Sequence, residues 1–287
     1  MISDIKILIL GAKGMLGHDL MAVFEDHQPT GWDINEIDIT NKDDVFKKIG
    51  TLNPEIIINA AAYTDVDGAE KNKELAMRVN REAVGYLAEI CVQNNIILVH
   101  YSTDYVFHGN KKEGYKEEDI PEDPVNFYGQ SKLLGEKEIK DCKLKIENFK
   151  YYLIRTAWLF GPKSNPHQHK NFVDTILKLA QERKEIKVVD DQFGSPTYTY
   201  DLARATKELI EKNYPSGIYH LTNSGMTNWY QFAKKIVKLS GLKTKILPCS
   251  SKEFLRPAKR PKYSFLVNTK FPKMRFWQEA LSDYLNL

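Results

Sequence analysis

Short apolar runs alternate with amphipathic segments over the first half of the chain. The runs have strand length and apolar residues on both faces, as buried parallel strands do; they are Lys6–Leu10, Glu55–Ala60, Ile96–Ser102 and Tyr151–Trp158. Helical periodicity lies between them, at Leu16–Phe24, Asp43–Ile49, Glu74–Asn94 and Asn126–Lys140. This alternation predicts an α/β fold, a Rossmann-like doubly wound parallel sheet.

The pattern becomes less regular after Leu159. A polar stretch at 161–170 precedes further elements, predicted as helices at Phe172–Arg183, Asp201–Lys212, Asn228–Leu239 and Trp277–Tyr284, strands at Ile186–Val189 and Gly217–Leu221, and loops at Leu255–Leu266. We therefore expect a dinucleotide-binding domain over residues 1–158 and a smaller α/β substrate lobe over 159–287. The two are expected to be interleaved, with some segments of the second returning to the sheet.

Composition narrows the class of protein. The 287 residues carry 41 Lys and Arg against 38 Asp and Glu, and the net charge of +3 is too small to favour nucleic acid or a membrane surface as a partner. The three cysteines, Cys91, Cys142 and Cys249, have neither metal spacing nor a disulfide framework. The first apolar run is too short for a signal peptide, and none is long enough to span a bilayer. We expect a soluble, cytoplasmic protein without a metal.

A glycine-rich turn follows the first predicted strand. Gly11, Gly14 and Gly17 lie between that strand and a helix, where they permit a tight turn and close approach of a pyrophosphate to the helix N-terminus. Asp33, 22 residues after Gly11, suits the ribose hydroxyls of NADH, whereas Lys13 inside the turn suits the 2′-phosphate of NADPH. The sequence therefore predicts a nicotinamide dinucleotide and leaves NADH or NADPH open.

The strand at Ile96–Ser102 runs into Thr103 and Asp104. In a doubly wound sheet ligands bind beyond the carboxyl ends of the strands, so both side chains are expected at the site. The Thr103 hydroxyl is suited to bind and polarise a substrate carbonyl.

Tyr128 and Lys132 are four residues apart in a predicted helix, which places them on one face. A nearby ammonium stabilises a phenolate and lowers the tyrosine pKa from its usual ~10. Such a tyrosine can give its proton to a developing alkoxide, as the reduction of a ketone requires.

Several longer strings carry a family resemblance. They are the glycine turn, Asn59–Thr64 (NAAAYT), Ser102–Phe107 (STDYVF), Tyr128–Lys132 (YGQSK), Arg155–Trp158 (RTAW), Asn171–Val173 (NFV), Asp191–Thr197 (DQFGSPT) and Arg260-Pro261. Together they resemble the extended short-chain dehydrogenase/reductases, and within them the branch that reduces dTDP-linked 4-keto-6-deoxy sugars. The resemblance covers nearly the whole chain.

The resemblance implies a role for each matching residue. Tyr128 would donate the proton to the C4 oxygen, Lys132 would hold the nicotinamide ribose and lower the Tyr128 pKa, and Thr103 would bind the same oxygen. Asp104 and Trp158 would contact the substrate, and Asn80 would lie close to the site. With Tyr128 and Lys132, the cofactor would be lined by Gly11, Gly14, Met15, Leu16, Gly17, Asp33, Asp38, Ile39, Ala62, Tyr63, Thr64 and Tyr101.

The implied reaction is the NADPH- or NADH-dependent reduction of dTDP-4-dehydro-L-rhamnose to dTDP-L-rhamnose. The expected partner of the protein is the dTDP-sugar, and the question of a homodimer is left open. Dehydration is disfavoured because Tyr105 follows Asp104 where a dehydratase would carry Glu. Another sugar-nucleotide reductase, an epimerase and a non-catalytic NAD(P)-binding subunit, resembling that of methionine adenosyltransferase, remain alternatives.

The polar stretch at 161–170 is longer than the resemblance implies. It contains His167 and His169, but two histidines without a third ligand are weak grounds for a metal, and a solvated or substrate-covering loop is favoured. The lysine-rich stretch Lys252–Lys262 suits a nucleotide diphosphate or a solvated loop.

Overall fold

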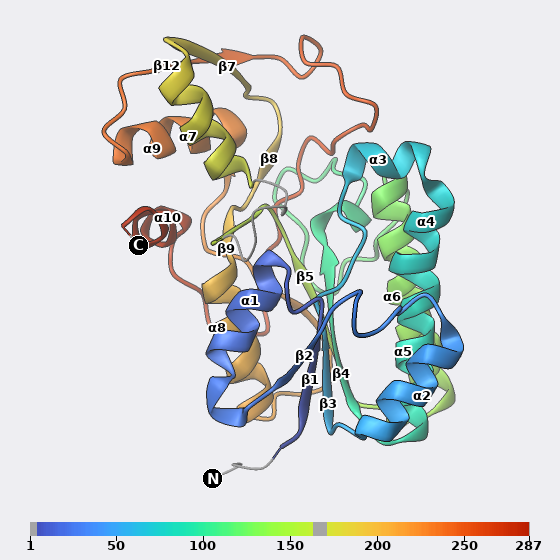
Figure 1. The fold of residues 1–287 in the computed structure, drawn as a ribbon. Helices are drawn as coiled ribbons and strands as arrows, with labels where there is room; N and C mark the ends of the chain where they lie inside the picture. Colours follow the sequence, from blue (N-terminus) through green and yellow to red (C-terminus); the bar gives the residue numbers. More distant parts are fainter. Residues whose placement is uncertain (1–4, 163–170, 287) are drawn as a thin grey trace.

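The computed structural model describes residues 5–162 and 171–286. One six-stranded parallel sheet forms its centre, in the order β10-β5-β4-β3-β1-β2 (Figure 1). The strands are β1 (Ile7–Leu10), β2 (Thr30–Trp32), β3 (Ile56–Asn59), β4 (Ile97–Thr103), β5 (Tyr151–Thr156) and β10 (Gly217–His220). The predicted doubly wound α/β fold is confirmed.

Helices cover both faces of the sheet (Figure 1). On one face α1 (Met15–Val23) packs beside α8 (Thr199–Glu211), and the apolar cluster beneath them includes Leu20, Ile58 and Leu202. On the other face lie α2 (Lys42–Leu52), α5 (Ala83–Gln93) and α6 (Phe127–Lys145), over a cluster that includes Val45, Leu87 and Ile139. Apolar side chains on both faces of each strand explain the unbroken apolar runs of the sequence.

The long helix expected at Glu74–Asn94 contains a local irregularity. It consists of α4 (Lys73–Met77), a π-helical turn η2 (Arg78–Glu82) and α5, and it follows the short helix α3 (Val66–Lys71). The π turn carries the fully buried Asn80. Such turns often mark functional sites, because the extra residue redirects a side chain.

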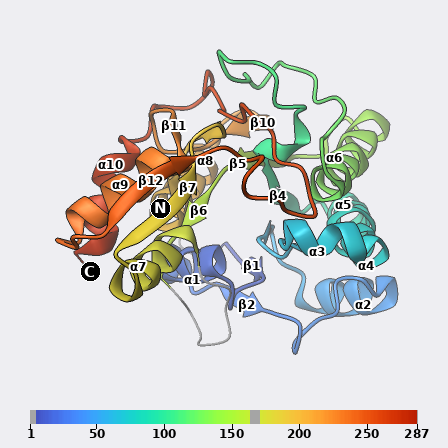
Figure 2. The ribbon, with the colours of Figure 1, turned by 90° about the horizontal axis from the view of Figure 1, so that it is seen from above.

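A smaller lobe lies above the carboxyl ends of the strands (Figure 1). It contains α7 (Phe172–Glu182), α9 (Trp229–Leu239) and α10 (Trp277–Leu285) around a shared apolar cluster, with β7 (Glu185–Val189) paired to β12 (Lys245–Cys249). Figure 2 shows α7, α9 and β12 on the side of the molecule that carries α1 and α8. Short elements join the lobe to the sheet: β6 (Leu159–Phe160), β8 (Phe193–Gly194), β9 (Thr197–Tyr198) and β11 (Thr227–Asn228). Two 3-10 turns belong to the sheet domain: η1 (Glu25–His27) lies between α1 and β2, and η3 (Asp104–Val106) follows β4.

The two halves of the chain are intertwined. Both α8 and β10 come from the second half, yet they pack against the sheet domain. The boundary between residues 158 and 159 stays a prediction. Within the described residues, no helix combines the length and the apolar character needed to cross a membrane.

Candidate active site

The predicted site residues follow the carboxyl ends of neighbouring strands. Gly11 follows β1, Asp33 follows β2, Ala62 lies shortly after β3, and Thr103 ends β4. Because parallel neighbours end at the same edge, these positions meet below the smaller lobe.

The glycine turn is built for close approach. Gly11 has a φ of 75°, and a Cβ on Gly17 would lie 2.0 Å from the Gly11 carbonyl oxygen. Gly14, the N-cap of α1, provides no side-chain cap for the first N–H groups of that helix. This open helix N-terminus fits the pyrophosphate of a dinucleotide.

Asp33 and Lys13 are both tied to the turn. The backbone N–H of Lys13 donates to Asp33 Oδ2 at 3.0 Å, and the Lys13 ammonium lies 3.0 Å from Glu36 Oε1. Asp33 therefore braces the turn, while Glu36 holds the amine expected for a 2′-phosphate.

Two further loops border the same edge. In the first, Asp38 Oδ1 accepts from the backbone N–H of Thr40, and Ile39 is buried. In the second, Asn80 binds both backbone groups of Tyr63, at 2.9 and 3.0 Å. The π turn thus fixes the loop that contains Ala62, Tyr63 and Thr64.

Thr103 is held in place by its neighbours. Its hydroxyl donates to Asp104 Oδ1 at 3.0 Å and accepts from the backbone N–H of Tyr105 at 3.2 Å. Burial raises the Asp104 pKa to about 7, with the Thr103 hydroxyl opposing the rise.

Tyr128 lies in the first turn of α6, which Asn126 caps by accepting from the backbone N–H of Gly129 at 2.8 Å. Its ring meets that of Tyr105 edge-on, with centroids 6.1 Å apart. Burial raises the Tyr128 pKa to about 12; a hydrogen bond with Thr103 opposes this rise, and the Asp104 charge adds to it.

Lys132 was expected to lower the Tyr128 pKa, and this effect does not occur in the structure. Lys132 is buried, and its amine donates to the Tyr101 carbonyl at 2.6 Å and lies 3.2 Å from His100 Nε2. Burial lowers the Lys132 pKa to about 8. The i, i+4 spacing correctly predicted that both residues lie in one helix. It contained no information about the groups of β4 that contact the amine, the Tyr101 carbonyl and the His100 ring.

One turn further along α6, Glu136 forms a fully buried ion pair with Arg155 of β5. The two contacts are 2.7 and 2.9 Å, and Ser102 donates to the same carboxylate at 2.7 Å. His220 of β10 lies 3.3 Å from the guanidinium. This cluster fixes α6 to β4, β5 and β10.

Trp158 lies between an aromatic ring and a glycine. It stacks on Trp229 with centroids 3.6 Å apart, and a Cβ on Gly194 would lie 2.6 Å from its indole. Its φ of 49° is unusual for a tryptophan and turns the chain at the end of β5.

A cavity of about 600 Å³ lies beside Tyr105, between α7, β7 and the segment at 251–260. Apolar side chains, among them Phe172, Ile176 and Trp229, form part of its wall. Its basic residues are Lys187, Lys252, Arg256, Lys259 and Arg260. This combination suits a flat base attached to a negatively charged group.

The segment at 251–260 is tied to the sheet domain. Arg260 makes a two-pronged contact with Asp67 of α3, at 2.5 and 2.9 Å, and Asn126 donates to the Lys259 carbonyl at 2.8 Å. The wall of the cavity is thereby connected to the start of α6. Figure 1 shows this segment reaching across to α3.

Sequence reasoning missed several residues that build the site: His100, Tyr105, Glu136, Trp229 and Asp67. A signal existed for one of them, because His100 interrupts an otherwise apolar strand just before Thr103. The partners of Glu136 and Asp67 are 19 and 193 residues away and follow only from the fold.

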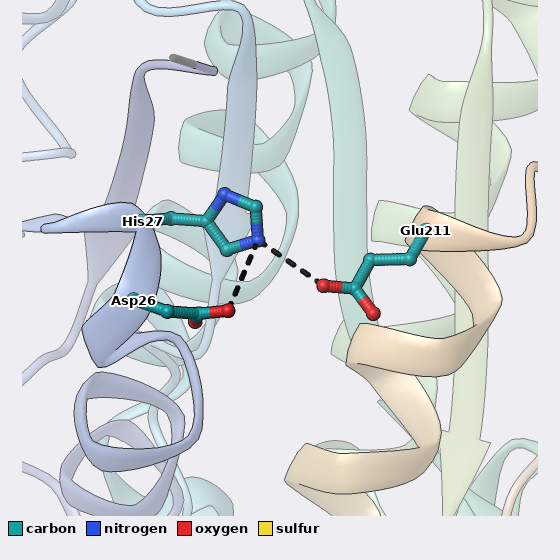
Figure 3. A group of neighbouring side chains, drawn as sticks. All are labelled: Asp26, His27 and Glu211. Carbon is teal, nitrogen blue, oxygen red and sulfur yellow. Dashed lines mark hydrogen bonds and ion pairs between the residues drawn. The ribbon is translucent and has the colours of Figure 1, made fainter. Parts of the chain in front are cut away.

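One cluster within the described residues has the composition of a metal site: Asp26, His27 and Glu211 (Figure 3). His27 Nε2 lies 3.2 Å from Glu211 Oε1, and the ammonium of Lys207 binds Asp26 and lies 3.7 Å from Glu211. A lysine therefore already balances both carboxylates. His167 and His169 lie outside the described residues.

Known proteins resemble this chain over its full length. A family model described as the RmlD substrate binding domain matches residues 5–287. The spore coat polysaccharide biosynthesis protein SpsK of Bacillus subtilis is 38% identical, over 98% of this chain and 96% of that protein. A dTDP-4-dehydrorhamnose reductase of Aggregatibacter actinomycetemcomitans is 39% identical, over 97% of each chain.

A solved structure has the same fold. The dTDP-4-dehydrorhamnose reductase of Bacillus anthracis, crystallised in complex with NADP, superposes with a TM-score of 0.91 at 38% identity, covering 99% of both chains. The glycine turn and the match along the chain lead to one conclusion: the chain belongs to the RmlD substrate binding domain family.

Proposed function

We propose that this protein is an NAD(P)H-dependent oxidoreductase that reduces the C4 ketone of dTDP-4-dehydro-L-rhamnose to dTDP-L-rhamnose. The observation that carries this proposal is the position of Thr103 and Tyr128 on either side of Tyr105. The Tyr105 N–H and Asp104 hold the Thr103 hydroxyl at the end of β4, and the Tyr105 ring packs edge-on against the ring of Tyr128. Two hydroxyls placed in this way can both reach one substrate oxygen. The relatives named dTDP-4-dehydrorhamnose reductase support the choice of substrate.

The cofactor region fits a nicotinamide dinucleotide. The turn at Gly11–Gly17 leaves the N-terminus of α1 open to a pyrophosphate. When bound, the reduced nicotinamide supplies the hydride. Asp33 and the loop that Asn80 fixes at Tyr63 would orient the two ends of the cofactor.

Thr103 and Tyr128 perform complementary tasks. Asp104 and the Tyr105 N–H hold the Thr103 hydroxyl in place, and on substrate binding its proton turns from Asp104 to the C4 oxygen. Tyr128 donates its proton to that oxygen as negative charge develops there. Its raised pKa keeps the phenol protonated at neutral pH, so the proton is available.

The cavity beside Tyr105 is the proposed place for the nucleotide. Tyr105 contacts both the cavity and the ring of Tyr128, so a ligand there lies next to the proton donor. Arg256 and Arg260 would face the diphosphate, and Trp229 and Phe172 the base.

The test is to supply dTDP-4-keto-6-deoxy sugar with NADPH or NADH and follow nicotinamide absorbance. Wild type should oxidise the cofactor, and Tyr128→Phe should lose roughly a hundredfold or more in rate. Tyr105→Phe is the matched control, because it also removes one tyrosine hydroxyl beside the site. Equal rates for wild type and Tyr128→Phe would refute the mechanism. Cofactor binding without turnover would favour the regulatory-subunit alternative.

A further inference from the structure

A chain of hydrogen bonds leads from the loop after β3 to the amine of Lys132. Asn59 and His100 are direct cross-strand partners on β3 and β4, and each is 1% exposed. The Ala61 N–H donates to Asn59 Oδ1 at 3.1 Å, and Asn59 Nδ2 lies 3.1 Å from His100 Nδ1. The other ring nitrogen, Nε2, lies 3.2 Å from Lys132 Nζ.

These contacts determine where the histidine carries its proton. Burial lowers the His100 pKa well below its ordinary value, so the ring is neutral and has one N–H. Ala61 fixes the oxygen end of the Asn59 amide, which leaves the NH₂ end facing Nδ1. Nδ1 must therefore accept, and the proton of the ring lies on Nε2.

The Nε2–H group points at an amine. An ammonium has three N–H groups and no acceptor, so it would place two donors against each other. A neutral amine instead accepts from Nε2–H with its lone pair and still donates to the Tyr101 carbonyl at 2.6 Å. The bonds are satisfied only with a neutral lysine.

We propose that His100 is a positioning residue for Lys132: as the Nε2–H tautomer it donates to the lysine and holds its amine neutral in the cofactor-free protein. Burial lowers the Lys132 pKa, with the Glu136 charge opposing it, and a donor aimed at Nζ lowers it further. The other ionisable groups of this region are Tyr128 and Glu136 on α6, Tyr101 and Asp104 at the end of β4, and Arg155 of β5, which binds Glu136.

This arrangement links the lysine charge to the cofactor region. For Lys132 to take up a proton, His100 must carry its own on Nδ1, and Asn59 must turn its oxygen toward that N–H. Ala61 then loses its acceptor. Ala61 lies against the glycine turn, since a Cβ on Gly11 would be 2.8 Å from its nitrogen. The meaning of this link for catalysis rests on the proposed function; the tautomer itself does not.

The first test is ¹⁵N NMR of histidine-labelled, cofactor-free protein at neutral pH. The His100 signals are assigned by their absence in His100→Gln. The Nε2–H tautomer is expected, and the Nδ1–H or doubly protonated ring would overturn the proposal. This measurement needs no substrate, so it stands even if the protein does not reduce a dTDP-sugar.

The second test uses Asn59→Asp, a substitution of nearly equal shape. A carboxylate can accept from both Ala61 N–H and Nδ1–H, so it should shift the ring to the Nδ1–H tautomer and leave Nε2 as an acceptor for an ammonium. The Lys132 pKa, followed through its ¹³Cε shift and assigned with Lys132→Met, should rise by about one unit or more. The alkaline limb of kcat/KM should move the same way. A changed tautomer with an unchanged Lys132 pKa would overturn the proposal.

Discussion

Two buried ionisable groups one turn apart on α6 have opposite surroundings. Glu136 is fully buried and has Arg155 as a two-pronged partner, Ser102 as a donor and Lys140 nearby. Lys132 is also buried, but the groups that its amine contacts, the Tyr101 carbonyl and His100, are both neutral. The carboxylate of Glu136 has a counter-charge within the protein, and the contacts of the Lys132 amine provide none.

The difference separates support from chemistry. A buried ion pair with its hydrogen bonds satisfied holds elements in a fixed arrangement, here α6 against β4 and β5. An uncompensated lysine costs folding free energy, and its lowered pKa makes its proton easy to exchange near neutral pH. Such a group is expected where a ligand completes its surroundings.

Of the variants considered, Lys132→Met should lower the activity most, and it should not lower the stability of the fold. The rate of dTDP-sugar reduction should fall by roughly a hundredfold or more, because the variant loses the amine that is proposed to hold the nicotinamide ribose. Thermal unfolding should occur at the same or a higher temperature, since a desolvated amine is removed. A variant that unfolds much earlier than wild type would show that Lys132 is structural.

Glu136→Gln should show the reverse pattern. It leaves the Arg155 guanidinium buried without a counter-charge, which costs about 3–5 kcal/mol in the free energy of unfolding. Denaturant unfolding measures this loss. The double variant Glu136→Gln with Arg155→Met removes both charges and should recover much of it. Lys140→Gln is the control, because its ammonium is partly exposed and lies 3.5 Å from the carboxylate.

The sequence was sufficient for the arrangement of the sheet domain. The apolar strands and amphipathic helices were predicted correctly because burial determines the spacing of apolar residues along each element. The glycine turn was predicted correctly because only glycine fits the close contacts found there. The paired strands β7 and β12 were only half predicted. The residues of β12, Lys245–Cys249, include a proline and alternate poorly, so their pairing depends on a partner about 60 residues away.

The candidate site was predictable in its members and not in its electrostatics. Motif spacing named Thr103, Tyr128 and Lys132, and the structure places Thr103 at the end of β4 and the other two in α6, while their roles stay predictions. It also predicted a lowered Tyr128 pKa, whereas burial raises it. Desolvation depends on everything packed around a group, and a spacing of four residues contains no information about that.

Asp67→Asn tests the partly buried ion pair between Asp67 and Arg260. The Arg260 contact, strengthened by the Ala258 N–H and Arg256, lowers the Asp67 pKa to about 2 from an ordinary 3.8. A depressed pKa contributes stability above the unfolded value and loses it as pH falls through the folded one, so wild type should exceed the variant by about 2 kcal/mol at neutral pH. The gap should close between roughly pH 4 and pH 2. A gap that is constant with pH would contradict the linkage.

The same variant should weaken substrate binding. Asp67 holds Arg260 at the wall of the cavity, so KM for the dTDP-sugar should rise severalfold while KM for the cofactor stays unchanged. Asp119→Asn is the matched control, because it removes the carboxylate of another ion pair, with Lys111 at 2.7 Å, whose residues do not line the cavity.

Lys207→Gln, at the surface cluster of Figure 3, should give the smallest effect. The pair with Asp26 joins η1 to α8, but the Asp26 side chain is 60% exposed, and exposed pairs contribute little to the free energy of unfolding. The lysine also decides what the cluster binds. While its ammonium balances Asp26 and Glu211, added Zn²⁺ should not raise the unfolding temperature of wild type. In Lys207→Gln the two carboxylates and His27 lose that cation, and a zinc-dependent rise should appear. A zinc response already present in wild type would show that the lysine does not occupy the place of a metal.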